Sequence, residues 1–260
     1  MRNIWTIARK ELSSYFRSPI AYSVLAMFAL IFGYFYYQTL SMFILQSLTQ
    51  AQYAQMYGEN VPPMNVNDMV IRPLLYTTGV LGLFLVPMIT MRLFAEEKKT
   101  GTIELLMTSP VTDVQVIFGK FWAALMLYMT MLGITLLHFL VLFRYGYPDW
   151  KPLVAGYIGQ FLLGCSFLSI GLLFSTFTRN QLIAGSMTFF SLLLLWVLDI
   201  SSQYSGSWWG GFAHYVALTP HMDNFSKGVL DLKDTVYYLS VIALGLFFSV
   251  RSVESVRWRA

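Results

Sequence analysis

Two long runs of residues without a charged side chain constrain this chain more than any other feature. They span residues 73–91 and 121–143, and the charged stretch from Arg92 to Lys120 separates them. Each run is long enough to cross a bilayer as a helix. The whole chain has only 12% charged residues, against about 25% in an average soluble domain. We therefore expect an integral membrane protein with a compact charged loop between two spans.

Hydropathy along the chain predicts an all-α integral membrane protein with six transmembrane helices. Residues 1–18 form an amphipathic interfacial helix, and residues 19–260 form the six-span domain. The predicted spans are 20–40, 73–91, 121–143, 152–178, 180–198 and 235–250. The last span has only 16 uncharged residues, so we expect Leu232 and Val253 to extend it. The stretch from Ser41 to Asp68 is expected to be an external loop whose first half can continue the helix.

The first eighteen residues are typical of a helix that lies in the membrane interface. Apolar residues recur on about a third of its circumference at 100° per residue, and basic residues fill the adjacent face. Pro19 marks the bend into the first span. The candidate interfacial residues are Trp5, Arg9, Lys10 and Arg17. A signal peptide is the alternative, but the following apolar run is too long and lacks a cleavage site.

The distribution of basic residues predicts the orientation. With the N-terminus inside, 12 of the 17 Lys and Arg residues lie on the cytoplasmic side and 5 on the other. Positive residues concentrate on the cytoplasmic side of membrane proteins. We therefore expect both termini and the charged loop in the cytoplasm, with the chain in the inner cell membrane.

The charged loop contains local signals for two short helices. Thr100 or Gly101 can begin a helix that Ser109-Pro110 closes, with Glu104 in its first turn. Thr112 and Gln115 then have the spacing of a capping box that starts the helix of the third span.

Searches for catalytic and metal-binding motifs find little. Lys120 follows a glycine but lacks the second glycine of a phosphate-binding loop, and no zinc-protease motif is present, so we do not expect this chain to hydrolyse ATP. The single Cys165 excludes an internal disulfide. For His138 a hydrogen-bonded packing role is favoured over a proton relay. His214, His221 and Met222 carry nitrogen and sulfur ligands that suit copper, so a copper site is conceivable, although no fixed spacing supports one.

Several motifs give the chain a resemblance to a known family. They are Ala8-Arg9-Lys10-Glu11, Arg17-Ser18-Pro19, the run from Phe94 to Leu106 with Glu96-Glu97, Gly101-Thr102 and Glu104-Leu105-Leu106, then Ser109-Pro110, and Leu218-Thr219-Pro220. Together with the order of spans they resemble the membrane permease of ABC-2 type (type V) ABC transporters. The run 225–231 and the tail 251–258 are similar to the branch with gliding-motility and nitrous-oxide-reductase-maturation permeases.

This resemblance implies a permease that couples ATP hydrolysis by a separate ATPase to export or translocation of a substrate. It implies two ABC ATPase subunits that bind ATP and Mg, no cofactor or metal in this chain, and a second copy or a similar permease. An extracytoplasmic auxiliary protein and membrane lipid are further partners, and nucleic acid is not. The implied ATPase-coupling residues are Glu96, Glu97, Lys98, Lys99, Gly101, Thr102, Glu104, Leu105, Leu106, Ser109 and Pro110.

Other interpretations stay open at this stage. Without the resemblance, the charged run at 96–99 is better explained as a solvated turn. A permease-like scaffold could also drive assembly of an envelope machine or a metalloenzyme with no freely transported substrate. A lipid-modifying enzyme would need clustered polar residues at an interface, and the sequence shows none. Apolar and aromatic spans favour a lipid-like, glycan-lipid or peptide cargo over a small ion.

Overall fold

The computed structural model describes residues 2–57, 64–103, 111–202 and 208–257, and these residues form helices joined by short connections. The elements are α1 (Arg2–Arg17), α2 (Pro19–Tyr57), the short π-helix η1 (Asn67–Ile71), α3 (Arg72–Thr90), α4 (Ala95–Thr100), α6 (Asp113–Tyr145), α7 (Trp150–Phe177), α8 (Gln181–Ser202), α9 (Trp208–Val216), α10 (Pro220–Ser226) and α11 (Leu232–Arg257).

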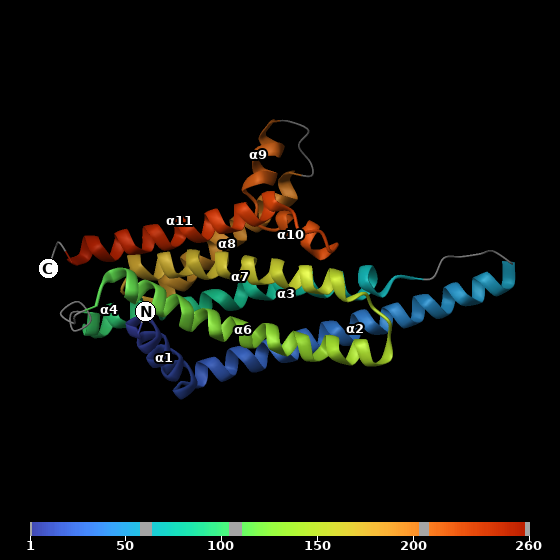
Figure 1. The fold of residues 1–260 in the computed structure, drawn as a ribbon, viewed down its shortest axis with the longest axis horizontal. Coiled ribbons are helices and arrows are strands. Elements are labelled where there is room, and N and C mark those ends of the chain that lie inside the picture. Colours follow the sequence, from blue (N-terminus) through green and yellow to red (C-terminus); the bar gives the residue numbers. More distant parts are fainter. Residues whose placement is uncertain (1, 58–63, 104–110, 203–207, 258–260) are drawn as a thin grey trace.

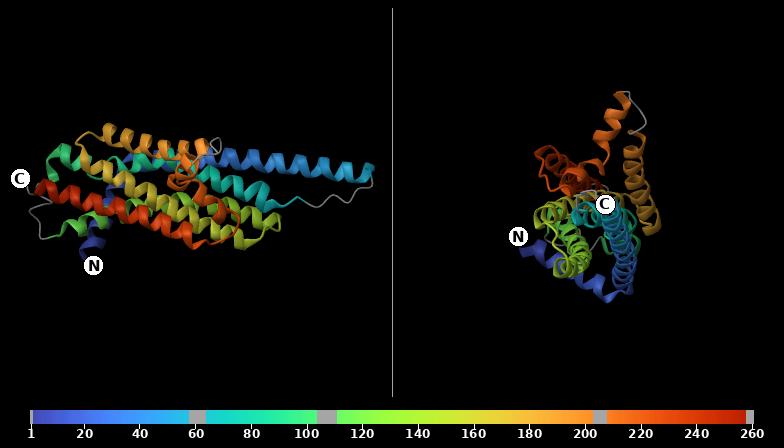
Figure 2. Two further views of the ribbon diagram at one scale, coloured as in Figure 1. Left: turned by 90° about the horizontal axis from the view of Figure 1, so that it is seen from above. Right: turned by 90° about the vertical axis from the view of Figure 1, so that its right-hand side faces the viewer.

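Six of the described helices are long and apolar enough to cross a membrane: α2, α3, α6, α7, α8 and α11. The predicted fold class, an all-α membrane protein with six transmembrane helices, is therefore confirmed. The first of these helices runs on to Tyr57, well past the expected end of the span at residue 40. Its 39 residues make a rod of about 58 Å, and Figure 2 shows its second half projecting beyond the rest of the bundle.

Helix α7 is the centre of the bundle. It contacts α3, α6, α8, α10 and α11, and 72% of its most apolar stretch is buried, compared with 17% for α8. Small residues allow this close packing. A Cβ atom at Gly164 would lie 2.1 Å from the ring of Tyr128 on α6, so only glycine fits there. Tyr128 in turn donates a hydrogen bond to the carbonyl oxygen of Gln160 on α7.

The bundle has two different ends. At one end lie α1, α4, the start of α6 and the end of α7, which we call the α4 end (Figure 1). At the opposite end lie η1, the start of α7, α9 and α10, which we call the α10 end. There Asn67 exchanges two hydrogen bonds with the backbone of Asp149, at 2.8 and 3.0 Å, and so ties η1 to the loop before α7.

Candidate functional site

The charged run after α3 forms the six-residue helix α4, and another helix holds its first turn. The backbone N–H groups of Phe94 and Ala95 donate to the hydroxyl of Ser175 on α7, at 2.9 and 3.2 Å. Because it accepts these two hydrogen bonds, the fully buried Ser175 acts as an N-cap for α4 that comes from a distant part of the chain. Since a helix this short is not stable alone in water, α7 determines where α4 lies.

The charges of α4 agree with the direction of its helix dipole. Glu96 and Glu97 lie in the first turn, and Lys98 and Lys99 lie in the last. Acidic groups near the N-terminus and basic groups near the C-terminus stabilise a helix. Lys98 also donates a hydrogen bond to the carbonyl oxygen of Thr176, which attaches the second turn of α4 to α7.

A buried lysine joins three helices at this end. The ammonium group of Lys120 on α6 lies 2.9 Å from a carboxylate oxygen of Glu11 on α1 and 2.9 Å from one of Glu97 on α4. Its side chain is only 1% exposed, and its Nζ lies 5.0 Å from the centre of the Phe94 ring. A buried ammonium ion requires such pairing, because an isolated charge is strongly disfavoured in an apolar environment.

This cluster holds one positive and two negative charges and is not fully satisfied. Oxygen Oε1 of Glu97 pairs with Lys120, whereas its buried Oε2 has no hydrogen-bond partner among the described residues. Glu97 therefore directs its carboxylate toward the interior of the protein.

The end of α1 is fastened to the end of α3. Tyr15 is buried, and its hydroxyl donates to the carbonyl oxygen of Ile89 at 2.9 Å. Burial raises the pKa of the Tyr15 phenol, and the negative charge of Glu11 raises it further, so the phenol stays a neutral donor. Arg92 pairs with Glu96 at 2.8 Å and donates to the hydroxyl of Ser18 at 3.1 Å.

The start of α6 has the predicted capping box. Thr112 accepts a hydrogen bond from the backbone of Gln115, and the Gln115 side chain accepts one from the backbone of Thr112. The same side-chain oxygen of Gln115 also accepts from the amide of Asn3, at 3.2 Å. The local signal in the sequence is therefore confirmed, and it also positions the start of α1.

Gly101 has a role that the sequence did not suggest, because it ends α4 with a left-handed φ of 75°. The sequence also suggested that Thr100 or Gly101 begins a helix, and residues 102 and 103, directly after Gly101, are helical. The rest of that predicted helix, to Ser109-Pro110, lies outside the described residues. The prediction missed α4 because its N-cap comes from Ser175, 80 residues away from Ala95, and leaves no local signal.

The predicted coupling residues therefore divide into three groups. Glu96, Glu97 and Lys98 contact other parts of the chain, as described above. Lys99, Gly101 and Thr102 are exposed, and the hydroxyl of Thr102 lies 2.9 Å from that of Thr100. Glu104, Leu105, Leu106, Ser109 and Pro110 lie outside the described residues.

The predicted interfacial residues of α1 all lie on its outer surface. Trp5 is 61% exposed, and Arg9, Lys10 and Arg17 are exposed as well. The apolar stripe predicted for this helix is divided, because Ala8 and Tyr15 are buried against the bundle while Trp5 and Phe16 are not. Helix α1 thus packs on protein through one face and presents a mixed aromatic and basic face outward.

Sequence reasoning missed three residues that build this end: Glu11 and Lys120 as a pair, and Ser175. A signal was present for the first two. Lys120 is the only charged residue between Asp113 and Arg144, and Glu11 is the only acidic residue of a basic helix. Ser175 carries no signal, since serine is common in membrane helices.

At the α10 end the charged groups have a different arrangement. Asp223 pairs with Arg72 and with Lys227, and it faces a hollow of about 860 Å³. His221 is buried, with Nδ1 2.7 Å from Asp234 and Nε2 3.1 Å from the carbonyl oxygen of Tyr215.

The histidines considered at the sequence level have other contacts. Both ring nitrogens of His221 face these acceptors, and within the described ranges no group of three His, Cys, Asp or Glu side chains could hold a metal ion. In α6, Nδ1 of His138 lies 2.9 Å from the carbonyl oxygen of Ile134, and its ring packs against Phe32 and Tyr36, which fits a packing role.

Comparison with known families decides the class of protein. The family model of the ABC-2 family transporter protein matches residues 5–225, which is most of the chain. The chain belongs to the ABC-2 transporter family. No curated protein matches it. As a member of this family the chain is a multi-pass membrane permease of an ABC transporter, and it is not itself the ATPase but partners with an ABC ATPase subunit. The resemblance seen in the sequence is thus confirmed at the level of the family.

Proposed function

We propose that this permease couples ATP hydrolysis on two separate ATPase subunits to the export of a substrate, and that α4 is the element that receives the ATPase movement. The observation that carries the proposal is the contrast within α4. Its inner side is fixed to α1, α6 and α7 through Glu97, Lys98 and the Ser175 cap. Its outer edge, with Lys99 and Thr100, is exposed.

In this arrangement a displacement of α4 is transmitted to the helices that it contacts. A movement of α4 acts on α6 and α1 through the Lys120 ion pairs and on α7 through Ser175. Packed elements move as rigid bodies because tightly packed interiors deform little, so a displacement of α4 moves several membrane helices together. A solvated turn would bend instead and transmit little.

The proposal includes an orientation and a location. The excess of Lys and Arg, 12 of 17, supports placing both termini and α4 in the cytoplasm of a cell whose inner membrane holds the chain. ATP and Mg then bind to the partner ATPase on the same side. The exposed Trp5 with Arg9, Lys10 and Arg17 suits a helix in contact with lipid head groups.

We further propose that the complex contains a second copy of the permease. Helices α2 and α8 are the least buried spans, with 22% and 17% of their most apolar stretches buried. Both pack against α3. Phe84 of α3 and Phe190 of α8 are exposed as well, and exposed apolar side chains of this kind suit contact with a second copy.

Charge reversal at the exposed edge of α4 tests the coupling role. We expect Lys99→Glu to leave expression unchanged, because exposed substitutions usually cost within about 0.5 kcal/mol. The amount of ATPase that co-purifies with the permease should fall strongly, since loss of one partner of a charge pair that becomes buried in an interface costs about 2 to 5 kcal/mol. Lys151→Glu, an exposed lysine near the α10 end, is the matched control. Equal ATPase recovery with both variants would contradict the proposed docking site.

A further inference from the structure

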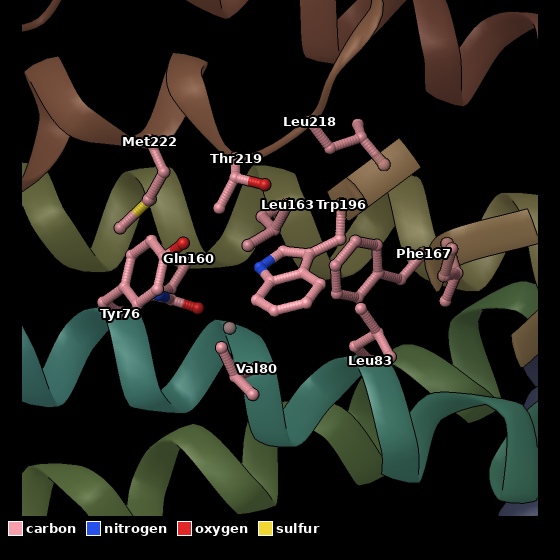
Figure 3. Close-up of a pocket in the computed structure, with 12 residues that line it drawn as sticks. Tyr76, Val80, Leu83, Gln160, Leu163, Phe167, Trp196, Leu218, Thr219 and Met222 are labelled. Carbon is pink, nitrogen blue, oxygen red and sulfur yellow. The ribbon is translucent and has the colours of Figure 1, made fainter. Parts of the chain in front are cut away.

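A small apolar cavity lies between α3, α7 and α8, next to α10 (Figure 3). Its volume is about 20 Å³, and its walls include Val80, Leu83, Leu163 and Phe167. No charged side chain lines it among the described residues. It is therefore a site for an uncharged group.

Two buried polar atoms in this cavity have no partner within the described part of the chain: Oε1 of Gln160 and Nε1 of Trp196. Gln160 is fully buried, and its Nε2 donates to the carbonyl oxygen of Leu75, which fixes the amide and leaves Oε1 as a free acceptor. Figure 3 shows the indole nitrogen of Trp196 on the side of the ring that faces Gln160. Buried polar groups normally have partners, so this pair requires an explanation.

A hydroxyl group matches the pair, because it donates one hydrogen bond and accepts others. The cavity volume exceeds the roughly 10 to 15 Å³ that a water-sized group needs. We propose that the cavity binds the hydroxyl of an uncharged, lipid-like alcohol, which donates to Oε1 of Gln160 and accepts from the N–H of Trp196. The apolar walls favour an alcohol with an aliphatic chain over a polar solute.

The rest of such a molecule can lie in a space that adjoins the cavity. The hollow of about 860 Å³ at the α10 end shares Tyr76, Thr219 and Met222 with the cavity, so the two spaces adjoin. The hollow has charged residues, Asp68, Arg72 and Asp223, and an apolar part with Pro73, Tyr76, Pro220 and Met222. A molecule that enters through the hollow can reach the cavity with its hydroxyl and leave its aliphatic end in this apolar part.

Fluorine NMR on the permease in phosphatidylcholine nanodiscs tests the proposal, since this lipid carries no hydroxyl. The chain has seven tryptophans, and Trp196→Phe identifies the signal of Trp196 after labelling with 5-fluorotryptophan. We expect 1-octanol to shift that signal saturably, and heptyl methyl ether, which only accepts hydrogen bonds, to bind about tenfold more weakly. Absence of a saturable shift would mean a cavity filled by water alone, and equal affinity for both probes would mean that donation by the hydroxyl does not contribute to binding. Either result would overturn the proposal.

Two glycine variants separate this site from binding elsewhere. A Cβ at Gly79 would lie 3.2 Å from Cδ2 of Leu163 and 4.0 Å from Oε1 of Gln160, so Gly79→Ala fills the cavity and keeps both polar groups. Gly133→Ala on α6 is the control, because no atom of another described element lies within 4 Å of its Cβ position. The octanol shift should disappear in the first variant and persist in the second. Unchanged binding by Gly79→Ala would contradict the assignment, provided its other tryptophan signals match those of the wild type.

The source of the natural ligand follows from a second measurement. If a hydroxylated lipid co-purifies with the wild type and is lost in Gly79→Ala, the site holds a bilayer lipid. If none co-purifies and octanol raises ATP hydrolysis in the complex with the ATPase, the site holds cargo. The cargo assignment rests on the proposed function, whereas the NMR binding needs no ATPase, so the two can fail separately.

Discussion

The two ends of this permease contain the same kinds of charged side chain in opposite environments. At the α4 end Lys120 is 1% exposed, and its partners Glu11 and Glu97 are each 16% exposed. At the α10 end Arg72 is 38% exposed, and Asp223 and Lys227 are both 46% exposed. The first cluster connects three helices, while the second lies beside an open hollow.

Burial decides what each cluster does for the fold. An exposed ion pair contributes about 0 to 1 kcal/mol, because water and salt screen it. A buried pair is not a large net stabiliser either, but removing one partner leaves an uncompensated charge that costs about 3 to 5 kcal/mol. The α4 end is therefore sensitive to every member of its cluster, and this fixes the geometry that the proposed coupling needs.

Replacement of Lys120 should have the largest effect. In Lys120→Met the carboxylates of Glu11 and Glu97 face each other in a buried site, so we expect a loss of about 3 to 5 kcal/mol in stability. Arg72→Met, at the exposed cluster, should lose no more than about 1 kcal/mol. Thermal unfolding of both purified variants in one detergent measures the difference. Similar melting temperatures would show that the two clusters are equivalent after all.

Substitution of Gly101 should have an intermediate effect. Its φ of 75° is disfavoured for residues with a side chain, and Gly101→Val should destabilise the end of α4 by roughly 1 to 2 kcal/mol. Among the described residues beyond its chain neighbours, no atom lies within 4 Å of a Cβ at this position, so the expected cost comes from the backbone. Faster amide hydrogen exchange in α4 reports the effect. Gly101→Asn is the control, because asparagine tolerates this conformation, and equal exchange in the two variants would exclude backbone strain as the cause.

The smallest effect is expected at the exposed cluster, as a dependence on pH. Burial alone would raise the pKa of Asp223, but hydrogen bonds from Lys227 and Arg72 outweigh it and lower that pKa below its ordinary value. The stabilisation is therefore fully present above about pH 4, the pKa of an unfolded aspartate, and is lost as the pH falls through the lower folded value. Melting temperatures of the wild type and Asp223→Asn should converge between pH 6 and pH 3. A difference that stays constant over this range would show that the ion pair is not the cause.

Local signals predicted the parts of the site that depend on neighbours in the chain. The capping box of Thr112 and Gln115 joins residues three apart, so its chemistry is readable from spacing alone. Long uncharged runs gave the six membrane helices for the same reason, since each span must satisfy its own backbone hydrogen bonds. The fold class followed from these features, whereas the family was suggested by the resemblance of its motifs and shown by the family model.

The partners of the charged residues could not be predicted in this way. Glu97 pairs with Lys120 across the loop, and Lys120 pairs with Glu11 from 109 positions earlier. The sequence shows which charged side chains are present but not which of them form ion pairs, because helix packing determines the pairs. The burial of Ala8 and Tyr15 of α1 against the bundle likewise could not be predicted, since periodicity describes one apolar stripe and packing divided it.

The amino-acid sequence by itself determined that this chain is an all-α membrane protein with six spans, a charged loop and an excess of positive charge toward one side. Those properties depend on transfer of side chains from water to lipid, which acts on each segment separately. Only the tertiary structure decided that Ser175 caps α4, that Lys120 joins three helices, and that Gln160 and Trp196 face one cavity. These arrangements depend on which helices touch, and that is set by the close packing of the whole bundle around α7.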